Sequence, residues 1–217
     1  MCGLIGIASK EINQRDIDDC ILAGKELLKE RGPDAFGYKI SKTRNSVLCQ
    51  SLLSITNDLG LDKQPYSRKK IISSFNGEIY NYRELYLKNI QLFENNSINE
   101  IEVISALYQN KGLDFLNNLN GMFAIAIYSE GTSEFPFEHI LLARDRFGVK
   151  PLFYSDSLNN KLIYSSSCYS FEKLAKNNLN FLDISSASSL LTLGHIIGSN
   201  TLIKGVKQVE SGSAIIY

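Results

Sequence analysis

The chain of 217 residues has the length of one large domain or two small ones, and 44% of its residues are hydrophobic. Its 23 basic and 23 acidic side chains cancel, so charge predicts no contact with nucleic acid or an anionic membrane. Lys10 and Glu11 interrupt the apolar opening and no apolar run approaches the roughly 18–20 residues of a membrane span, which predicts a cytoplasmic protein.

The first half of the chain predicts a helix flanked by strands. Apolar, glycine-rich residues 2–8 predict a buried strand. An apolar stripe over residues 16–30 predicts a helix. The sequence Arg-Gly-Pro-Asp at 31–34 ends that helix, because glycine and proline both interrupt helices. Further strands are expected at 36–40, 46–51 and 71–75.

The second half is richer in strands. Apolar spacing predicts a helix over residues 99–109 and another over 182–193. Strands are expected at 121–129, 139–144, 151–154, 161–165 and 213–217, the first two joined by a polar hairpin loop through 131–133. Several strands grouped with few helices predict sheets packed on each other with helices outside, in one domain over residues 1–217.

The cysteines and histidines offer little for metal chemistry. The four cysteines are widely spaced without a CxxC motif, so no zinc site is predicted. Cys20, Cys49 and Cys168 are expected to be small buried hydrophobic residues. His139 and His195 lie in no recognisable catalytic motif, and we expect both to be structural.

Cys2 offers a route to catalysis that needs no histidine. Removal of Met1, which a small second residue permits, would leave a thiol and a free α-amine on the same residue. An α-amine titrates near about 7.7–8.0, against about 8.5 for a cysteine thiol. A base with a pKa close to the ambient pH suits proton transfer. Cys2 is therefore a candidate for both nucleophile and base.

The pair Asn76-Gly77 has two interpretations. Asn and Gly tolerate positive φ, so the pair is typical of a two-residue hairpin turn. Alternatively, the Asn76 amide and the Gly77 N–H are two donors that form an oxyanion hole, each worth roughly 2.7–4 kcal/mol of barrier. Chemistry alone leaves both interpretations open.

Five motifs in order resemble a known family, the glutaminase domain of glutamine-hydrolysing asparagine synthetases. This domain is a class II glutamine amidotransferase and an N-terminal nucleophile hydrolase. The resemblance implies an α+β fold, an αββα four-layer sandwich with two mainly antiparallel sheets between helical layers. The motifs are MCGLIGI at the N-terminus, ERGPDAFG at 30–37, FNGEIYNYREL at 75–85, NGMFAIAIYS at 120–129 and LLARDRFGVKPLFY at 141–154, and residues 191–217 continue the similarity.

The resemblance also implies roles for individual residues. Cys2 would be nucleophile and base, and Asn76 and Gly77 the oxyanion hole. The glutamine-binding set would include Glu78 and, in the loop that holds the α-amino acid end of the substrate, Leu53, Ile55 and Thr56. Residues 31–34 and the pair Arg144-Asp145 would wall the site, and we favour an ordinary turn and a buried ion pair as their structures.

Two positions depart from the family pattern. Leu52 stands where the family has an arginine that grips the α-carboxylate of glutamine, and Glu100 stands where an aspartate takes the α-ammonium. A hydrogen bond to a charged group is worth about 1.5–3 kcal/mol, so losing this one weakens glutamine binding roughly ten- to a hundredfold. Whether Lys42 or Arg44 reaches in to replace the arginine is left open.

The predicted function is hydrolysis of glutamine to glutamate and ammonia, with the ammonia passed to an asparagine-synthetase-like amidation on a partner synthetase domain. No cofactor is expected in this domain; ATP and Mg belong to the partner, because the pyrophosphate loop Ser-Gly-Gly-x-Asp-Ser is absent from the sequence. A homodimer is left open. The alternatives, both motivated by Leu52, are a hydrolase of an amide without a free α-carboxylate and a weak or inactive module for binding or regulation.

Overall fold

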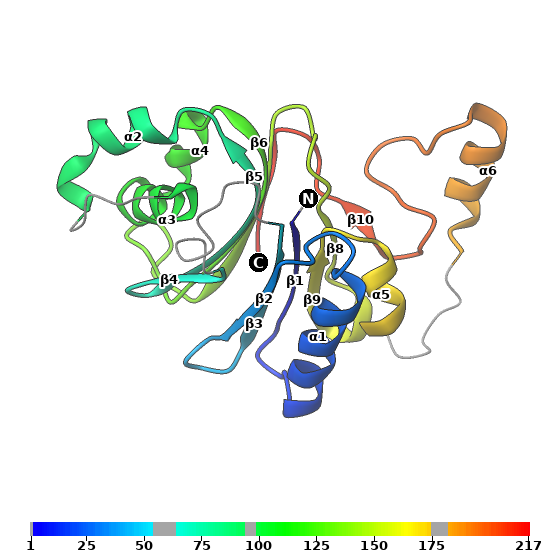
Figure 1. Cartoon of the computed structure of the whole chain (residues 1–217). Coiled ribbons are helices and arrows are strands. Elements are labelled where there is room, and N and C mark those ends of the chain that lie inside the picture. Colours follow the sequence, from blue (N-terminus) through cyan, green and yellow to red (C-terminus); the bar gives the residue numbers. More distant parts are fainter. Residues whose placement is uncertain (1, 54–63, 94–98, 175–181) are drawn as a thin grey trace.

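The structure is a computed structural model that describes residues 2–53, 64–93, 99–174 and 182–217. Two antiparallel sheets pack face to face, and helices cover their outer faces (Figure 1). This arrangement confirms the predicted α+β sandwich.

The first sheet carries the N-terminal strand at its centre. Within the described ranges its strand order is β10-β8-β9-β1-β3-β2. Strand β1 pairs antiparallel with β3, from Gly3 opposite Ser51 to Ala8 opposite Ser46. The strands are β1 (Gly3–Ala8), β2 (Ala35–Ile40), β3 (Ser46–Leu52), β8 (Phe153–Ser155), β9 (Leu162–Ser165) and β10 (Lys207–Gln208).

The second sheet has the order β11-β7-β6-β5-β4. Its strands are β4 (Tyr66–Arg68), β5 (Ile71–Ile79), β6 (Gly121–Ser129), β7 (His139–Arg144) and β11 (Ala214–Ile216). Strand β5 continues four residues beyond its predicted end at Phe75, and within it Asn76 pairs with Ala124 and Gly77 with Phe123. The hairpin-turn interpretation of Asn76-Gly77 is therefore wrong, because both residues lie inside a paired strand.

Helices form the outer layers. Helix α1 begins with a reciprocal cap, in which the Asn13 side chain accepts from the Asp16 N–H and the Asp16 carboxylate accepts from the Asn13 N–H. Helices α1 and α5 cover the first sheet, and α2, α3 and α4 cover the second (Figure 1). The helices are α1 (Gln14–Leu27), α2 (Tyr82–Lys88), α3 (Glu100–Lys111), α4 (Phe115–Asn118), α5 (Tyr169–Leu174) and α6 (Ile184–Leu193), with short 3-10 turns at Ile90–Leu92, Gly112–Asp114 and Leu158–Asn160.

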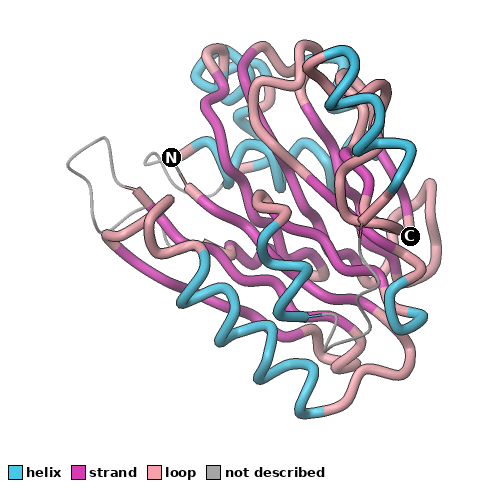
Figure 2. The backbone as a smooth tube through the Cα atoms, turned by 90° about the vertical axis from the view of Figure 1, so that its right-hand side faces the viewer, coloured by secondary structure: helices cyan, strands magenta, loops and turns pink. Residues whose placement is uncertain are grey.

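Three apolar cores separate the four layers. In Figure 2 the strands form the middle of the molecule, with helices crossing in front of them. The core between the sheets contains Leu4 and Leu48 from the first sheet and Ala124 from the second. The other two cores lie between each sheet and its helices, as Ile5 and Phe115 illustrate. Since side chains alternate along a strand, the even-numbered residues of β1 and β3 face the second sheet. That rule decides which polar residues meet inside the sandwich.

Helix α6 lies away from both sheets (Figure 1). It is capped by Asp183, whose side chain accepts from the Ser186 N–H at 2.8 Å, and Gly194 caps its C-terminal end in the left-handed conformation. Its large apolar side chains are exposed, with Ile184 at 73% and Leu191 at 87%. None of the helices in the described ranges is long and apolar enough to cross a membrane.

Candidate active site at one end of the two sheets

Cys2 lies at the end of the sandwich where β1 begins and β3 ends. Its sulfur accepts a hydrogen bond from the Leu53 N–H at 3.4 Å and lies 3.7 Å from the Leu53 carbonyl oxygen, to which the thiol can donate. The side chain is half-buried. The backbone of Leu53 therefore holds the sulfur beside the end of β3.

Strand alternation predicts on which face of its sheet each of Cys2, Leu52 and Asn76 lies. Cys2 and Leu52 are even-numbered and face the second sheet, like Leu4 and Leu48. On β5, Asn76 lies on the same face as its partner Ala124, which belongs to the core between the sheets. Strand alternation therefore predicts that all three side chains face the gap between the two sheets.

The amide of Asn76 is buried without an acceptor. The residue is 1% exposed, and among the described residues nothing accepts a hydrogen bond from its Nδ2. Buried donors are nearly always paired in folded proteins, and an unpaired one costs about 1–3 kcal/mol. Such a donor fits a site whose acceptor arrives with the ligand.

Gly77 has a backbone that only glycine fits. A Cβ atom there would lie 2.0 Å from the Met122 carbonyl oxygen and 2.7 Å from the Phe123 Cα, which are both backbone atoms of β6. The backbone groups of Phe123, the strand partner of Gly77, bond to Asp145 instead. The Phe123 N–H donates to the Asp145 carboxylate, and the Phe123 carbonyl accepts from the Asp145 N–H. By the alternation of an antiparallel ladder, the N–H of Gly77 points to the opposite, open edge of β5.

The neighbouring groups on this edge are held by side chains. The Phe75 N–H donates to Gln64 Oε1 at 2.8 Å, and the Ile79 N–H donates to the Glu100 carboxylate. Glu100 begins α3, where Asn99 caps the helix by accepting from the Glu102 N–H at 3.0 Å. The structure therefore places Glu100 beside Gly77 along the edge of the strand.

The remaining predicted site residues have different positions. Leu53 contacts Cys2 through its backbone, as described above, and Leu52 is half-buried. The side chain of Glu78 is exposed. Ile55 and Thr56 lie outside the described residues.

Sequence reasoning missed the role of Gln50. This residue is 1% exposed in β3, and its Nε2 donates across the gap between the sheets to the Phe75 carbonyl at 3.0 Å. The bond ties β3 to β5 next to Asn76. Gln50 directly follows the apolar run Val47–Cys49. This position was the signal available in the sequence, because a buried amide needs a hydrogen-bond partner.

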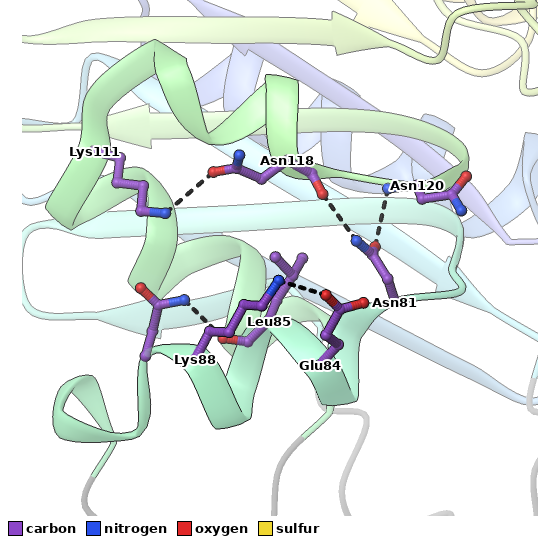
Figure 3. A network of polar contacts seen from close by, with 8 residues as sticks. Asn81, Glu84, Leu85, Lys88, Lys111, Asn118 and Asn120 are labelled. Carbon is purple, nitrogen blue, oxygen red and sulfur yellow. Dashed lines mark hydrogen bonds and ion pairs between the residues drawn. The ribbon is translucent and has the colours of Figure 1, made fainter.

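The turn after β5 is held by a network of side-chain amides (Figure 3). Asn81 Nδ2 donates to the Asn118 carbonyl at 2.9 Å, and Asn81 Oδ1 accepts from the Asn120 N–H at 2.9 Å. Lys111 in turn donates to the Asn118 side chain at 3.1 Å. The network links α3 and α4 to the turns that flank β5 and β6, so it fixes the end of the strand that carries Gly77.

Arg144 and Asp145 form two backbone clamps, which corrects the expected ion pair between them. The Arg144 guanidinium donates to the carbonyls of Lys150, Val209 and Gly148 at 2.6–2.8 Å. The Asp145 carboxylate accepts from the backbone N–H groups of four residues: Phe123, Phe147, Val149 and Lys150. Burial alone raises the pKa of Asp145, but these four N–H groups outweigh it, and the pKa lies below its usual value.

Neither Lys42 nor Arg44 replaces the arginine expected at position 52. Both lie in the turn between β2 and β3, where Lys42 pairs with Glu130 at 3.3 Å and Arg44 donates to Gln14. This turn precedes Ser46, and strand β3 rises about 3.4 Å per residue, so it lies roughly 17 Å from Ser51 at the Cys2 end. Lys42 and Arg44 therefore bind partners at the opposite end of the sandwich from Cys2.

Arg31 is a cation at the Cys2 end. It is half-buried, and its Nε and Nη2 are buried without an acceptor among the described residues. Burial lowers the pKa of Arg31, and the negative charge of the Cys2 thiolate acts in the opposite direction. The residue follows α1 in a turn in which the N–H groups of Arg31 and Gly32 donate to the Leu28 carbonyl at 3.0 Å.

The other cysteines and the histidines lie outside this site. Cys20 and Cys49 are fully buried, as predicted, whereas Cys168 is half-buried. His139 is buried, with Nδ1 donating to the Phe137 carbonyl at 2.7 Å and Nε2 bonded to the Tyr108 hydroxyl, as a structural residue would be. His195 is exposed.

A cavity of about 470 Å³ lies at the opposite end of the sheets. Its lining includes Ala8, Ser46 and His139, which are at the far ends of β1, β3 and β7 from Cys2. Since both ring nitrogens of His139 are engaged, the cavity offers no free histidine base. We therefore place the candidate chemistry at the Cys2 end.

Comparison with solved structures identifies the class of fold. A structure described as the allosteric regulatory enzyme of purine biosynthesis matches with a TM-score of 0.64, 17% identity and coverage of 99% of this chain and 46% of that chain. The glutamine phosphoribosylpyrophosphate amidotransferase of B. subtilis, solved with ADP and GMP, matches with a TM-score of 0.60, 15% identity and coverage of 100% and 49%. The chain therefore shares the fold of these two proteins.

Sequence comparison identifies the family. Residues 1–217 match the glutamine amidotransferase domain, and the chain belongs to that family. Asparagine synthetase [glutamine-hydrolyzing] 2 of Bacillus subtilis is 37% identical over 172 residues, 76% of this chain and 21% of that protein. Asparagine synthetase B of Escherichia coli K12 is 32% identical over 168 residues, 76% and 29% respectively. The chain thus spans less than a third of the length of these curated relatives.

Proposed function

We propose that the chain hydrolyses glutamine to glutamate and ammonia, with Cys2 as the nucleophile. The observation that carries the proposal is the buried Nδ2 of Asn76, which has no acceptor among the described residues and which strand alternation predicts to face the same space as the Cys2 sulfur. A carbonyl placed between them would meet a nucleophile on one side and a hydrogen-bond donor on the other. Family membership and the names of the relatives support glutamine as the amide.

The proposed reaction has two halves. In the first, the sulfur of Cys2 bonds to the side-chain amide carbon of glutamine, and the carbonyl electron pair moves to oxygen, where Asn76 Nδ2 and the Gly77 N–H donate to it. The thiol proton moves to the α-amine of Cys2 and then to the departing nitrogen, which leaves as ammonia. In the second half, water attacks the thioester, and the thiol of Cys2 is restored as glutamate leaves.

Glu100 and Glu78 complete the proposed substrate set. The Glu100 carboxylate lies beside Gly77 and carries the charge that suits the α-ammonium of glutamine. Glu78 follows Gly77 directly and is exposed at the same end of β5. Leu53, whose backbone bonds to the Cys2 sulfur, and Ile55 and Thr56 belong to the same proposed set through the family resemblance.

Replacement of Cys2 tests the proposal. Cys2→Ala is expected to abolish ammonia release from glutamine, measured on protein whose mass shows that Met1 has been removed. Cys168→Ala is the matched control, because Cys168 is the other half-buried thiol and lies outside the site; it is expected to retain full activity. Undiminished release by Cys2→Ala would overturn the assignment of the nucleophile.

The same assay separates the two alternatives. A hydrolase of a related amide would release ammonia faster from carboxyl-blocked glutamine than from glutamine. An inactive binding or regulatory module would release none from either substrate, although Cys2 is mature. Our proposal predicts release from glutamine at an ordinary enzyme rate.

We further propose that the ammonia passes to a partner synthetase domain that uses ATP and Mg. The relatives named as asparagine synthetases are several times longer than this chain, which supports a second functional unit.

Exposed Ile184 and Leu191 on α6 support a surface that another protein covers, since a helix this short is marginal in water without packing. Leu191→Ser is expected to lower glutamine-dependent amidation by the synthetase and to leave ammonium-dependent amidation unchanged. Equal loss with both nitrogen sources would contradict this surface.

A further inference from the structure

We propose that Arg31 binds the free α-carboxylate of the amide substrate, through the edge of its guanidinium that carries Nε and Nη2. The inference rests on the proposed function, because it concerns the substrate held beside Cys2. It assigns the site a substrate class, which is amides that carry a free carboxylate.

The backbone around Arg31 is fixed against the end of β3. Gly32 packs so closely that a Cβ atom would lie 2.4 Å from the Ser51 carbonyl carbon and 2.5 Å from the Leu52 nitrogen. Two residues later the Asp34 N–H donates to the Leu52 carbonyl at 3.0 Å. The next residue of the chain, Leu53, is the one that bonds to the Cys2 sulfur. Arg31 therefore begins a segment that runs along the strand end beside the nucleophile.

The donors of Arg31 match a carboxylate in number and geometry. Nε and Nη2 lie along one edge of the planar guanidinium, so their N–H groups are parallel and bind both oxygens of a carboxylate. Both nitrogens are buried, and no acceptor in the described part of the chain bonds to them. A buried cation with unpaired donors is costly to the folded state unless a ligand completes it.

Arg144 shows how this fold treats an arginine that is purely structural. All three nitrogens of its guanidinium donate to backbone carbonyls, those of Lys150, Val209 and Gly148. Arg31 is half-buried, whereas Arg144 is 8% exposed, and Arg31 keeps one edge of its guanidinium without an acceptor among the described residues. The difference assigns Arg31 to an external ligand and Arg144 to the fold.

The positive charge of Arg31 also suits the binding of a carboxylate at the Cys2 end of the sandwich. Leu52 has an apolar side chain that cannot bind a carboxylate, and Lys42 and Arg44 are bound at the opposite end of the sandwich. A substrate with a carboxylate anchored at Arg31 and its ammonium at Glu100 would be held by opposite charges at both ends of its α-carbon. The proposal therefore predicts that glutamine is preferred over the same amide with a blocked carboxylate.

The test compares L-glutamine with L-glutamine methyl ester as substrates of the full chain with mature Cys2. The wild type is expected to prefer glutamine in kcat/KM. Arg31→Gln is expected to lower kcat/KM for glutamine about ten- to a hundredfold, mainly through KM, and to change the methyl ester less than about threefold. Arg31→Lys keeps the charge without the paired donors and is expected to fall between. Arg15→Ala is the control, because Arg15 is an exposed arginine on α1.

The outcomes separate a binding role from a structural one. An equal loss with both substrates in Arg31→Gln, or no loss with either, overturns the inference. If Arg31→Gln melts at a lower temperature, the double variant Arg31→Gln with Leu52→Arg returns a guanidinium to the same strand end. Recovery of the preference for glutamine in the double variant supports a carboxylate site there, and its absence counts against one.

Failure of the proposed function has a different signature. If the wild type releases no ammonia from either substrate, hydrolysis is excluded, and binding is measured instead. Calorimetric titration of Cys2→Ala with L-glutamine then reports the carboxylate site alone. A Kd weakened at least tenfold by Arg31→Gln upholds the inference, whereas an unchanged Kd overturns it.

Discussion

Replacing Asn76 by alanine is expected to separate activity from stability. Removal of one oxyanion donor lowers kcat about 10²–10³-fold, which is roughly 2.7–4 kcal/mol of barrier. The unfolding free energy should change little, because two effects oppose each other. Loss of a buried amide weakens packing by about 1–2 kcal/mol, while removal of the Nδ2, buried without an acceptor among the described residues, relieves about 1–3 kcal/mol. The expected net change is within about 1 kcal/mol.

Two assays on the same protein test this expectation. Ammonia release from glutamine gives the kinetic loss, and urea unfolding followed by far-ultraviolet circular dichroism gives the free energy of unfolding. Ser74→Ala is the matched control: Ser74 lies on the same face of β5, and its buried hydroxyl also has no partner among the described residues. It should retain activity within a few-fold. A loss of less than tenfold in Asn76→Ala, or a destabilisation of about 3 kcal/mol or more, would show that Asn76 is a structural residue and refute the reasoning.

Two further predictions concern the framework of the site. Gly77→Ala should lower ammonia release at least about a hundredfold and reduce stability by about 1–3 kcal/mol, because the added methyl group meets the backbone of β6; an unchanged kcat would contradict the oxyanion role. Asp145→Asn should cost about 1.5–3 kcal/mol in urea unfolding at neutral pH. Because the folded pKa of Asp145 is lowered, its contribution is present above the unfolded value of about 3.9 and lost as the pH falls further. The difference between wild type and variant should therefore shrink below about pH 4, and a constant difference would refute this linkage.

Much of the fold follows from the sequence, because its patterns are local. The apolar runs of β1 and β6 and the helical stripe of α1 predict these elements within a few residues of their observed bounds. The short elements were missed: α2, α4, α5, β4 and β10 have two to seven residues each, too few to show a period. Contacts with distant parts of the chain determine whether such short segments form helices or strands. A single sequence does not show those contacts directly.

Around the candidate site, the sequence predicted residue types better than their arrangement. The Asn-Gly pair favours a turn by local propensity, yet pairing with β6 over the whole length of β5 overrides it. Arg144 and Asp145 are adjacent with opposite charges, so an ion pair was the natural expectation. Each instead finds several backbone groups, which are already fixed in place and cost less entropy to recruit.

Three of the buried polar atoms that lack a partner among the described residues support a site that is organised before its ligand arrives. Asn76 Nδ2 and the Nε and Nη2 of Arg31 are buried donors that no described residue satisfies, and all lie on segments bordering the Cys2 end of the sandwich. Each of these unpaired donors lowers the stability of the folded state, and a hydrogen bond to a neighbouring carbonyl would remove that cost. Two hydrogen bonds fix the strands beside them: Gln50 donates to the Phe75 carbonyl, and Asp145 accepts from the Phe123 N–H. A group that supplies two acceptors to Arg31 and one to Asn76 satisfies all three, and an amino acid with a side-chain amide has that set of oxygens.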